Sequence, residues 1–136
     1  MKSLFRQVMT MRKISLRRPD DCHLHLRDGA MLNRLVKHSA REFERAVVMP
    51  NLRNPVTTVE LARQYRQRIK AAAGDSSSFQ PLMTLYLTDQ TQADDIIEAS
   101  ETDWLVGAKL YPAGATTNSS FGVSSIVGLM PILEKM

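Results

Sequence analysis

The sequence has a single cysteine and no long hydrophobic run. Because Cys22 is the only cysteine among 136 residues, no disulfide can form within the chain, which suits a reducing compartment such as the cytoplasm. No stretch of about 18 apolar residues occurs, so no membrane span is expected. The Gly-x-Gly-x-x-Gly pattern and the phosphate-binding loop motif are also missing. A dinucleotide- or nucleotide-binding fold therefore has little support.

Acidic residues are missing from one end of the chain. The first 19 residues carry six basic side chains and no acidic one, whereas the remainder has 12 basic and 14 acidic side chains. The net charge of +4 is thus an N-terminal feature, and no nucleic-acid-binding face is expected on the domain. Residues 1–12 are interpreted as a basic, disordered extension or the product of a start codon assigned too early, although a transit peptide has the same composition.

Strand and helix patterns alternate through residues 13–136, which are expected to form one domain. Strands are expected over 13–17, from 20 through two histidines, and over 46–49, 81–87 and 105–111. Helices are expected over 29–38, 59–73, 92–100 and 126–136. This alternation implies an α/β fold with a parallel sheet. Polar residues follow successive strands, as in a (β/α)8 TIM barrel, of which about 250 residues are typical. The chain therefore has the length of an N-terminal half barrel.

A His-x-His pair lies in the segment Asp20–Gly29, Asp-Asp-Cys-His-Leu-His-Leu-Arg-Asp-Gly. Alternation along a strand places His23, His25 and Arg27 on one face. Two such imidazoles can bind one metal ion, and Arg27 can hold an anionic substrate beside it. Cys22 would point to the opposite face as a small buried hydrophobe. Packing or solvation of two histidines is the alternative for the same pattern.

Four blocks resemble, in order and spacing, the bacterial-type dihydroorotases of the metal-dependent amidohydrolase superfamily. They are Arg18–Gly29, Ala46–Leu52 (Ala-Val-Val-Met-Pro-Asn-Leu), Leu82–Asp89 (Leu-Met-Thr-Leu-Tyr-Leu-Thr-Asp), and Ala108–Pro112 (Ala-Lys-Leu-Tyr-Pro) with Ala115–Ser120 (Ala-Thr-Thr-Asn-Ser-Ser). The resemblance implies a (β/α)8 barrel with two zinc ions that reversibly hydrolyses L-dihydroorotate to N-carbamoyl-L-aspartate in pyrimidine synthesis. It also implies a cytoplasmic homodimer with a small-molecule substrate and no nucleic-acid or membrane partner.

The resemblance assigns roles to seven positions. His23 and His25 would bind the more buried metal, a carboxylated Lys109 would bridge both metals, Arg27 and Asn51 would hold the substrate carboxylate, and Thr116 and Thr117 would form the tip of a mobile loop. Considered without the family, these residues have simpler explanations. Lys109 would extend from a strand end to solvent, Asn51 would be a turn residue, and residues 116–120 would be a polar linker.

The chain departs from the family in what it lacks. Later strands of the family supply the histidines of the second metal and a catalytic aspartate, so an inactive fragment is expected. Gly114 and Phe121 replace more polar residues of the loop. An open half barrel is also expected to be poorly stable, to aggregate or to pair with another chain. The alternatives are a hydantoinase or allantoinase, which are not expected to share the block 108–120, and a non-catalytic remnant that binds a partner chain.

Overall fold

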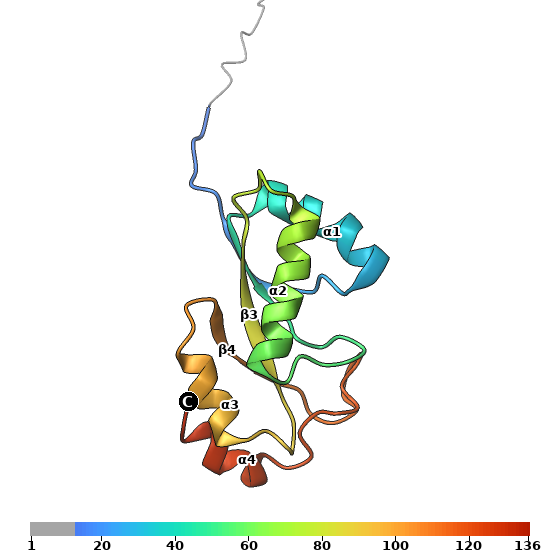
Figure 1. The fold of residues 1–136 in the computed structure, drawn as a ribbon, viewed down its shortest axis with the longest axis vertical. Coiled ribbons are helices and arrows are strands. Elements are labelled where there is room, and N and C mark those ends of the chain that lie inside the picture. Colours follow the sequence, from blue (N-terminus) through green and yellow to red (C-terminus); the bar gives the residue numbers. More distant parts are fainter. Residues whose placement is uncertain (1–12) are drawn as a thin grey trace, which may run out of the picture.

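The computed structural model describes residues 13–136, in which a four-stranded parallel sheet is formed by strands that alternate with helices along the chain (Figure 1). The strands, in both chain and sheet order, are β1 (Asp20–Leu24), β2 (Arg45–Val48), β3 (Gln80–Leu87) and β4 (Leu105–Leu110). The helices are α1 (Gly29–Glu42), α2 (Val59–Ala73), α3 (Ala93–Ser100) and α4 (Ile126–Leu133). The predicted α/β fold is thus confirmed. The expectation for residues 1–12 lies outside the described residues.

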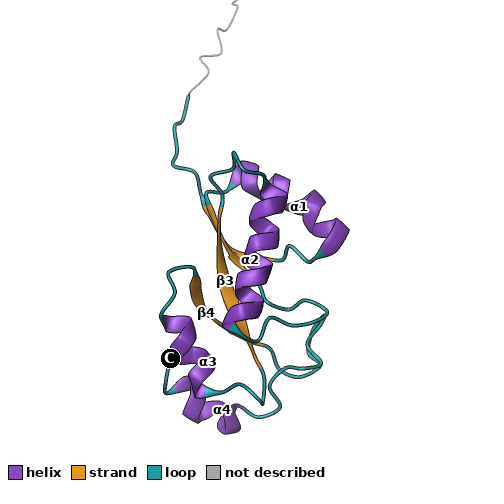
Figure 2. Cartoon of the chain, in the orientation of Figure 1, coloured by secondary structure: helices purple, strands orange, loops and turns teal. Residues whose placement is uncertain are grey.

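Helix α2 packs across the sheet and forms the centre of the hydrophobic core (Figure 2). Its inward side chains include Tyr65 and Ile69, which are fully buried in the same hydrophobic cluster as Val48 and Met83 of the strands. Thr58 caps the helix by accepting a hydrogen bond from the Leu61 amide at 3.3 Å, as the Thr-rich loop before it predicts. The helix ends at Gly74, whose φ of 95° few other residues adopt.

The opposite face of the sheet carries the polar strand ends. Leu85 and Leu87 belong to the core with the helices, so strand alternation turns Tyr86 toward the other face. Tyr86 is nevertheless fully buried, because the Tyr111 ring stacks on it with centroids 5.2 Å apart. The segment 112–123 then folds back over this face, where Val123 donates its amide to the Tyr111 carbonyl at 2.8 Å. We call this face the site face.

Strand β4 contains one residue more than its partner. Leu105 is paired with Met83, whereas Gly107 is paired with the next residue of β3, Thr84. Val106 is therefore the extra residue of a β-bulge, and its side chain is 49% exposed. Beyond the bulge, Lys109 lies opposite Tyr86 and thus on the site face.

The N-terminal part of the described chain differs from expectation in two respects. Residues 13–17 are not a strand, since they pair with no strand of the sheet. Arg18 instead donates to the carbonyls of Ala40 and Arg41 at the end of α1. Cys22 is exposed rather than buried, and it lies within a register shift of β1 between Asp21 and Leu24.

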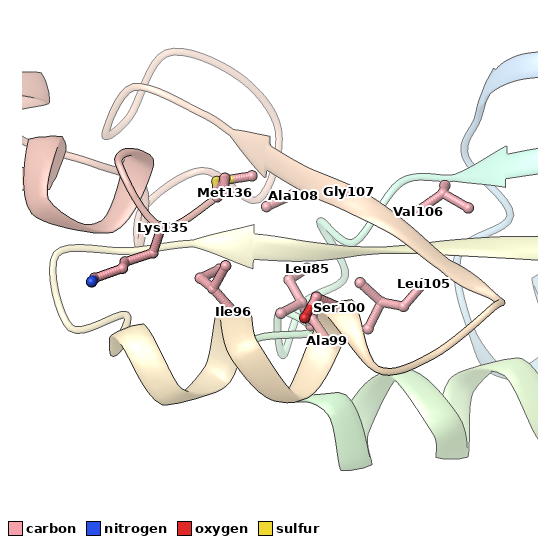
Figure 3. Close-up of a pocket in the computed structure, with 10 residues that line it drawn as sticks. All are labelled: Leu85, Ile96, Ala99, Ser100, Leu105, Val106, Gly107, Ala108, Lys135 and Met136. Atoms are coloured by element: carbon pink, nitrogen blue, oxygen red, sulfur yellow. The ribbon is translucent and has the colours of Figure 1, made fainter.

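One cavity lies between α3 and β4, on the helix side of the sheet (Figure 3). Its lining is mostly apolar and includes Leu85, Ile96 and Ala99, with Lys135 and Met136 beside it. None of the predicted site residues lines it. Between residues 13 and 136, no helix has the length and apolar character required to cross a membrane.

Candidate metal and substrate site

The two predicted metal-binding histidines converge. His23 lies in β1 and His25 just beyond its end, yet their Nε2 atoms are 3.1 Å apart and their ring centroids 5.0 Å apart. Asp21 fixes the strand locally, because its Oδ1 accepts a hydrogen bond from the His23 amide at 2.9 Å. The structure therefore brings together the pair that alternation along the strand predicts.

The surroundings of His25 favour its neutral form. Burial is the main cause that lowers the pKa of His25, and the positive charge of Arg27 lowers this pKa further. His23 and Lys109 act in the same direction, whereas the Asn51 side chain opposes them. A neutral imidazole has a lone pair available, and this is the form that binds a metal.

Arg27 does not continue the strand, so the prediction that it follows the histidines along one face is wrong. Strand β1 ends at Leu24, and Arg27 adopts a left-handed conformation with φ of 63° in the turn that leads into α1. Its guanidinium still reaches the site, because Nη1 donates to the Asn51 carbonyl at 3.4 Å. The chain has only four residues, His25 to Asp28, between the end of β1 and the start of α1, and the reversal within them breaks the alternation.

Asn51 is buried at the end of β2, where only 3% of its surface is exposed. Its Nδ2 donates to the Thr117 carbonyl at 3.1 Å, and its own carbonyl accepts from Asn118 Nδ2 at 3.0 Å. Its Oδ1 is buried and has no hydrogen-bond partner among the described residues. An amide oxygen without a partner is costly unless something else binds there. Asn51 is thus more than a turn residue.

The loop that contains Thr116 and Thr117, within segment 112–123, lies on the site face and is held there mainly by hydrogen bonds of its backbone. Tyr86 donates its hydroxyl to the Asn118 carbonyl at 3.2 Å, and the Thr116 amide donates to Ser119 Oγ at 2.8 Å. Thr117 contacts Asn51 through its carbonyl. The side chains of Thr116 and Thr117 lie in an exposed part of the loop. The structure thus brings the loop to the site without showing a contact for either threonine hydroxyl.

Lys109 is half-buried on the site face of β4. Its Nζ lies 5.7 Å from the centre of the Tyr111 ring. Among residues 13–136 it forms no ion pair.

The geometry of the histidine pair fits a shared metal ion. Two nitrogens bound to one tetrahedral zinc at about 2.05 Å lie roughly 3.3 Å apart, close to the observed separation of 3.1 Å. The described residues contain no cluster of three or more His, Cys, Asp or Glu side chains that could hold a metal. The two histidines thus fit part of a metal centre, which would need further ligands to be complete.

Residue patterns missed the tyrosines and Asn118 that fix this site. The one signal that could have indicated them is a tyrosine within an apolar strand or helix face, since a buried hydroxyl normally needs a hydrogen-bond partner. Asp89, which ends the block Leu82–Asp89 and follows β3, has a structural contact. Its Oδ1 accepts a hydrogen bond from the Ser124 amide at 2.9 Å and so holds the start of the segment before α4.

Comparison with known proteins identifies the family. The model of the Amidohydrolase family matches residues 21–129. The chain belongs to the amidohydrolase family. Among curated amidohydrolase relatives, the dihydroorotase of Allorhizobium ampelinum is 55% identical over 93% of this chain, and that of Jannaschia sp. is 56% identical over 90%. The matched regions are 36% and 35% of those proteins, so the chain spans about a third of their length.

Solved amidohydrolase structures agree with this assignment. The dihydroorotase of Campylobacter jejuni has a TM-score of 0.79 and 47% identity over 87% of this chain and 34% of its own. The dihydroorotase of Saccharomyces cerevisiae in complex with 5-fluoroorotic acid has a TM-score of 0.77 and 35% identity over 87% of this chain and 32% of its own. The resemblance to dihydroorotases is thus confirmed, and four of the eight strands of a (β/α)8 barrel occupy only about a third of the relatives' length.

Proposed function

We propose that this chain forms the N-terminal metal and substrate side of a dihydroorotase. The reaction is the zinc-dependent, reversible hydrolysis of L-dihydroorotate to N-carbamoyl-L-aspartate in pyrimidine synthesis. The observation that carries the proposal is the convergence of His23 and His25, with Nε2 atoms 3.1 Å apart, in a chain 55% identical to a dihydroorotase.

Three residues of the chain would hold metal. His23 and His25 would bind one zinc ion through Nε2, and Lys109, once carboxylated on its amine, would offer two oxygens that bridge this ion to a second. Bound metal supplies the acidity that makes hydroxide from water near neutral pH and polarises the substrate carbonyl. The position of Lys109, half-buried on the site face and without an ion pair among residues 13–136, supports this role.

Arg27 and Asn51 would bind the substrate carboxylate. A guanidinium binds a carboxylate through two hydrogen bonds, which fixes the orientation of the substrate ring. The Arg27 guanidinium already lies beside Asn51, and Asn51 has a buried side-chain amide. Thr116 and Thr117 would cover the bound substrate from the loop. The yeast relative was solved with 5-fluoroorotic acid, a carboxylate-bearing ring, which supports a substrate of this chemistry.

The chain requires further segments to complete such a site. Within residues 13–136 no three His, Cys, Asp or Glu side chains form a metal cluster, and the sheet has an open edge at β1 and another at β4. We propose that the remaining ligands and the proton-transferring aspartate come from the part of the family that the chain does not match. A cytoplasmic homodimer is the assembly that we propose for the complete enzyme.

A non-catalytic protein is the second candidate function. The incomplete ligand set favours it, because two histidines with one lysine do not by themselves provide a two-metal centre. Such a protein would bind a partner chain along its open sheet edges. Another cyclic-amide hydrolase, such as a hydantoinase or allantoinase, has less support because the relatives reported above are dihydroorotases.

The test measures zinc per chain and dihydroorotate hydrolysis, for residues 1–136 alone and co-expressed with the remaining part of the Allorhizobium ampelinum dihydroorotase. His23→Ala is compared with His38→Ala, a matched control because His38 is exposed on α1. We expect little zinc and no turnover alone, and zinc with turnover in the pair, both lost in His23→Ala only. Absence of zinc and turnover in a stable pair would favour the non-catalytic protein.

A further inference from the structure

The turn between β1 and α1 has an unusual backbone. Arg27 has φ of 63° and Gly29 has φ of 62°, so two of three consecutive residues are left-handed. For glycine this conformation is cheap, but a residue with a Cβ adopts it only at a steric cost. Such a conformation persists only where the surroundings impose it, and it often marks a functional site. The question is therefore which residues impose it on Arg27.

Tyr65 of α2 contacts this backbone directly. Its hydroxyl donates to the Arg27 carbonyl at 2.7 Å, although the two residues are 38 positions apart. The Tyr65 side chain is fully buried. Burial, together with the nearby Asp28 carboxylate, raises the pKa of its phenol, so the hydroxyl remains a donor throughout the physiological range. No water can easily replace this bond at a fully buried position.

Arg68, one turn further along α2, holds the next residue of the same turn. Its Nε donates to Asp28 Oδ1 at 3.1 Å and its Nη2 to Asp28 Oδ2 at 2.9 Å. The same carboxylate caps α1 by accepting from the Gly29 amide at 2.9 Å. The Arg68 guanidinium also lies 5.4 Å from the centre of the Tyr65 ring. One face of α2 thus holds two consecutive residues of the turn.

We propose that Tyr65 and Arg68 are positioning residues that hold the Arg27 turn, so that the Arg27 guanidinium lies beside Asn51. The side of α2 that faces the β1–α1 turn would then set the orientation of the Arg27 guanidinium, which is proposed to bind substrate. The role in substrate binding rests on the function proposed above for Arg27. The conformational role stands on the hydrogen bonds alone.

The conformational test uses Tyr65→Phe in the full chain of 136 residues, with Tyr86→Phe as the matched control. Both substitutions remove one hydroxyl bonded to a backbone carbonyl, that of Arg27 or that of Asn118. Positive φ places the amide and α protons of a residue close together, which gives a strong intraresidue NOE. We expect this NOE to weaken at Arg27 in Tyr65→Phe and to persist in Tyr86→Phe. An unchanged NOE at Arg27 in Tyr65→Phe would overturn the proposal.

The functional test uses the co-expressed pair described above. Loss of orientation at a substrate-binding arginine should raise KM for dihydroorotate about tenfold in Tyr65→Phe, while zinc per chain is unchanged. Arg68→Ala, a change at a half-exposed side chain that leaves the core intact, should raise KM about threefold. Unchanged KM in both variants would overturn the role in substrate binding.

The two tests separate the proposals. A pair without turnover would contradict the proposed dihydroorotase function, whereas the NOE at Arg27 would still decide whether Tyr65 imposes the left-handed turn. A changed NOE with an unchanged KM would show that Tyr65 shapes the turn and that the turn does not orient substrate.

Discussion

The two faces of the sheet differ in how completely the described chain covers them. Val48 points to the helices and is fully buried, whereas its neighbour Val47 points to the site face and is only half-buried. The two buried side-chain polar atoms without a partner among residues 13–136, Asn51 Oδ1 and Tyr111 Oη, both lie on the site side. The chain thus completes its hydrophobic layer and leaves its polar layer open to other groups.

The largest expected effect comes from blocking the closure of the loop over the site face. A Cβ at Gly122 would lie 2.3 Å from the Tyr111 carbonyl oxygen, so Gly122→Ala cannot fit without moving backbone. We expect it to lower the free energy of unfolding by about 3 kcal/mol, measured by urea denaturation.

Gly128→Ala is the control for Gly122→Ala. A Cβ at Gly128 would meet only the Ser125 side chain, at 3.8 Å, and Gly128 lies within α4. The change should stabilise the chain by up to about 1 kcal/mol because alanine is the better helix former. Equal tolerance of the two substitutions would show that segment 112–123 does not pack on the site face.

Two neighbouring valines compare the faces directly. Val48→Ala removes two methyl groups from the packed layer and should cost about 2 kcal/mol of unfolding free energy. Val47→Ala, one residue earlier in β2, should cost roughly half of that or less, because its side chain is already partly exposed. Urea denaturation of both variants measures the difference. Similar losses would mean that the site face is as fully packed as the helix face.

Some features of the fold and of the candidate site can be predicted from local sequence patterns. Periodicity and end signals predict α2 with the bounds that the structure has, Val59–Ala73, because a long amphipathic pattern between Thr58 and Gly74 is locally determined. The continuous apolar run 46–49 predicts a strand buried on both faces, and it therefore does not distinguish the buried Val48 from the half-buried Val47. The histidine pair follows from strand alternation, since both residues are at or next to the end of one strand.

The remaining features depend on contacts between distant residues. The hydrogen bond from Asn51 to Thr117 spans 66 positions, and that from Tyr65 to Arg27 spans 38. No local pattern encodes either contact. The left-handed turn at Arg27 breaks strand alternation for the same reason, because α2 imposes it from outside. The expected strand over 13–17 was wrong because a strand depends on a neighbour that its own residues cannot specify.

Removal of either of two buried hydroxyls on the site face should have a smaller effect on the free energy of unfolding, and the two effects should differ. Tyr86 donates to the Asn118 carbonyl, so Tyr86→Phe should cost about 1 kcal/mol. The Tyr111 hydroxyl is buried without a partner among the described residues, so Tyr111→Phe should be neutral or slightly stabilising. Thermal unfolding of the two variants checks this order. A larger loss for Tyr111→Phe would mean that its hydroxyl has a partner in solution.

The smallest expected effect is a pH dependence. Hydrogen bonds from Ser124 hold the pKa of Asp89 below its usual value. A carboxyl whose pKa is lower in the folded state stabilises the fold above its unfolded pKa of about 3.9. This contribution is lost as the pH falls from there through the folded value. Unfolding midpoints between about pH 5 and pH 3 should therefore fall less in Asp89→Asn than in the wild type. Parallel curves would show that the Ser124 contact contributes nothing.

The bulge in β4 determines which side chain of that strand lies on the site face. Up to Leu105 the strand is in phase with Met83 and the helix-side core, and after Val106 it is in phase with Thr84 and Tyr86. If Val106 were paired in the regular register, opposite Thr84, Lys109 would lie opposite Leu87, in the apolar layer, and Leu110 would be turned away from it. The bulge therefore acts as a spacer whose presence matters more than the chemistry of Val106. Many residues should be tolerated at this position, whereas a change that draws residue 106 into the ladder would exchange the polar and apolar faces of everything that follows.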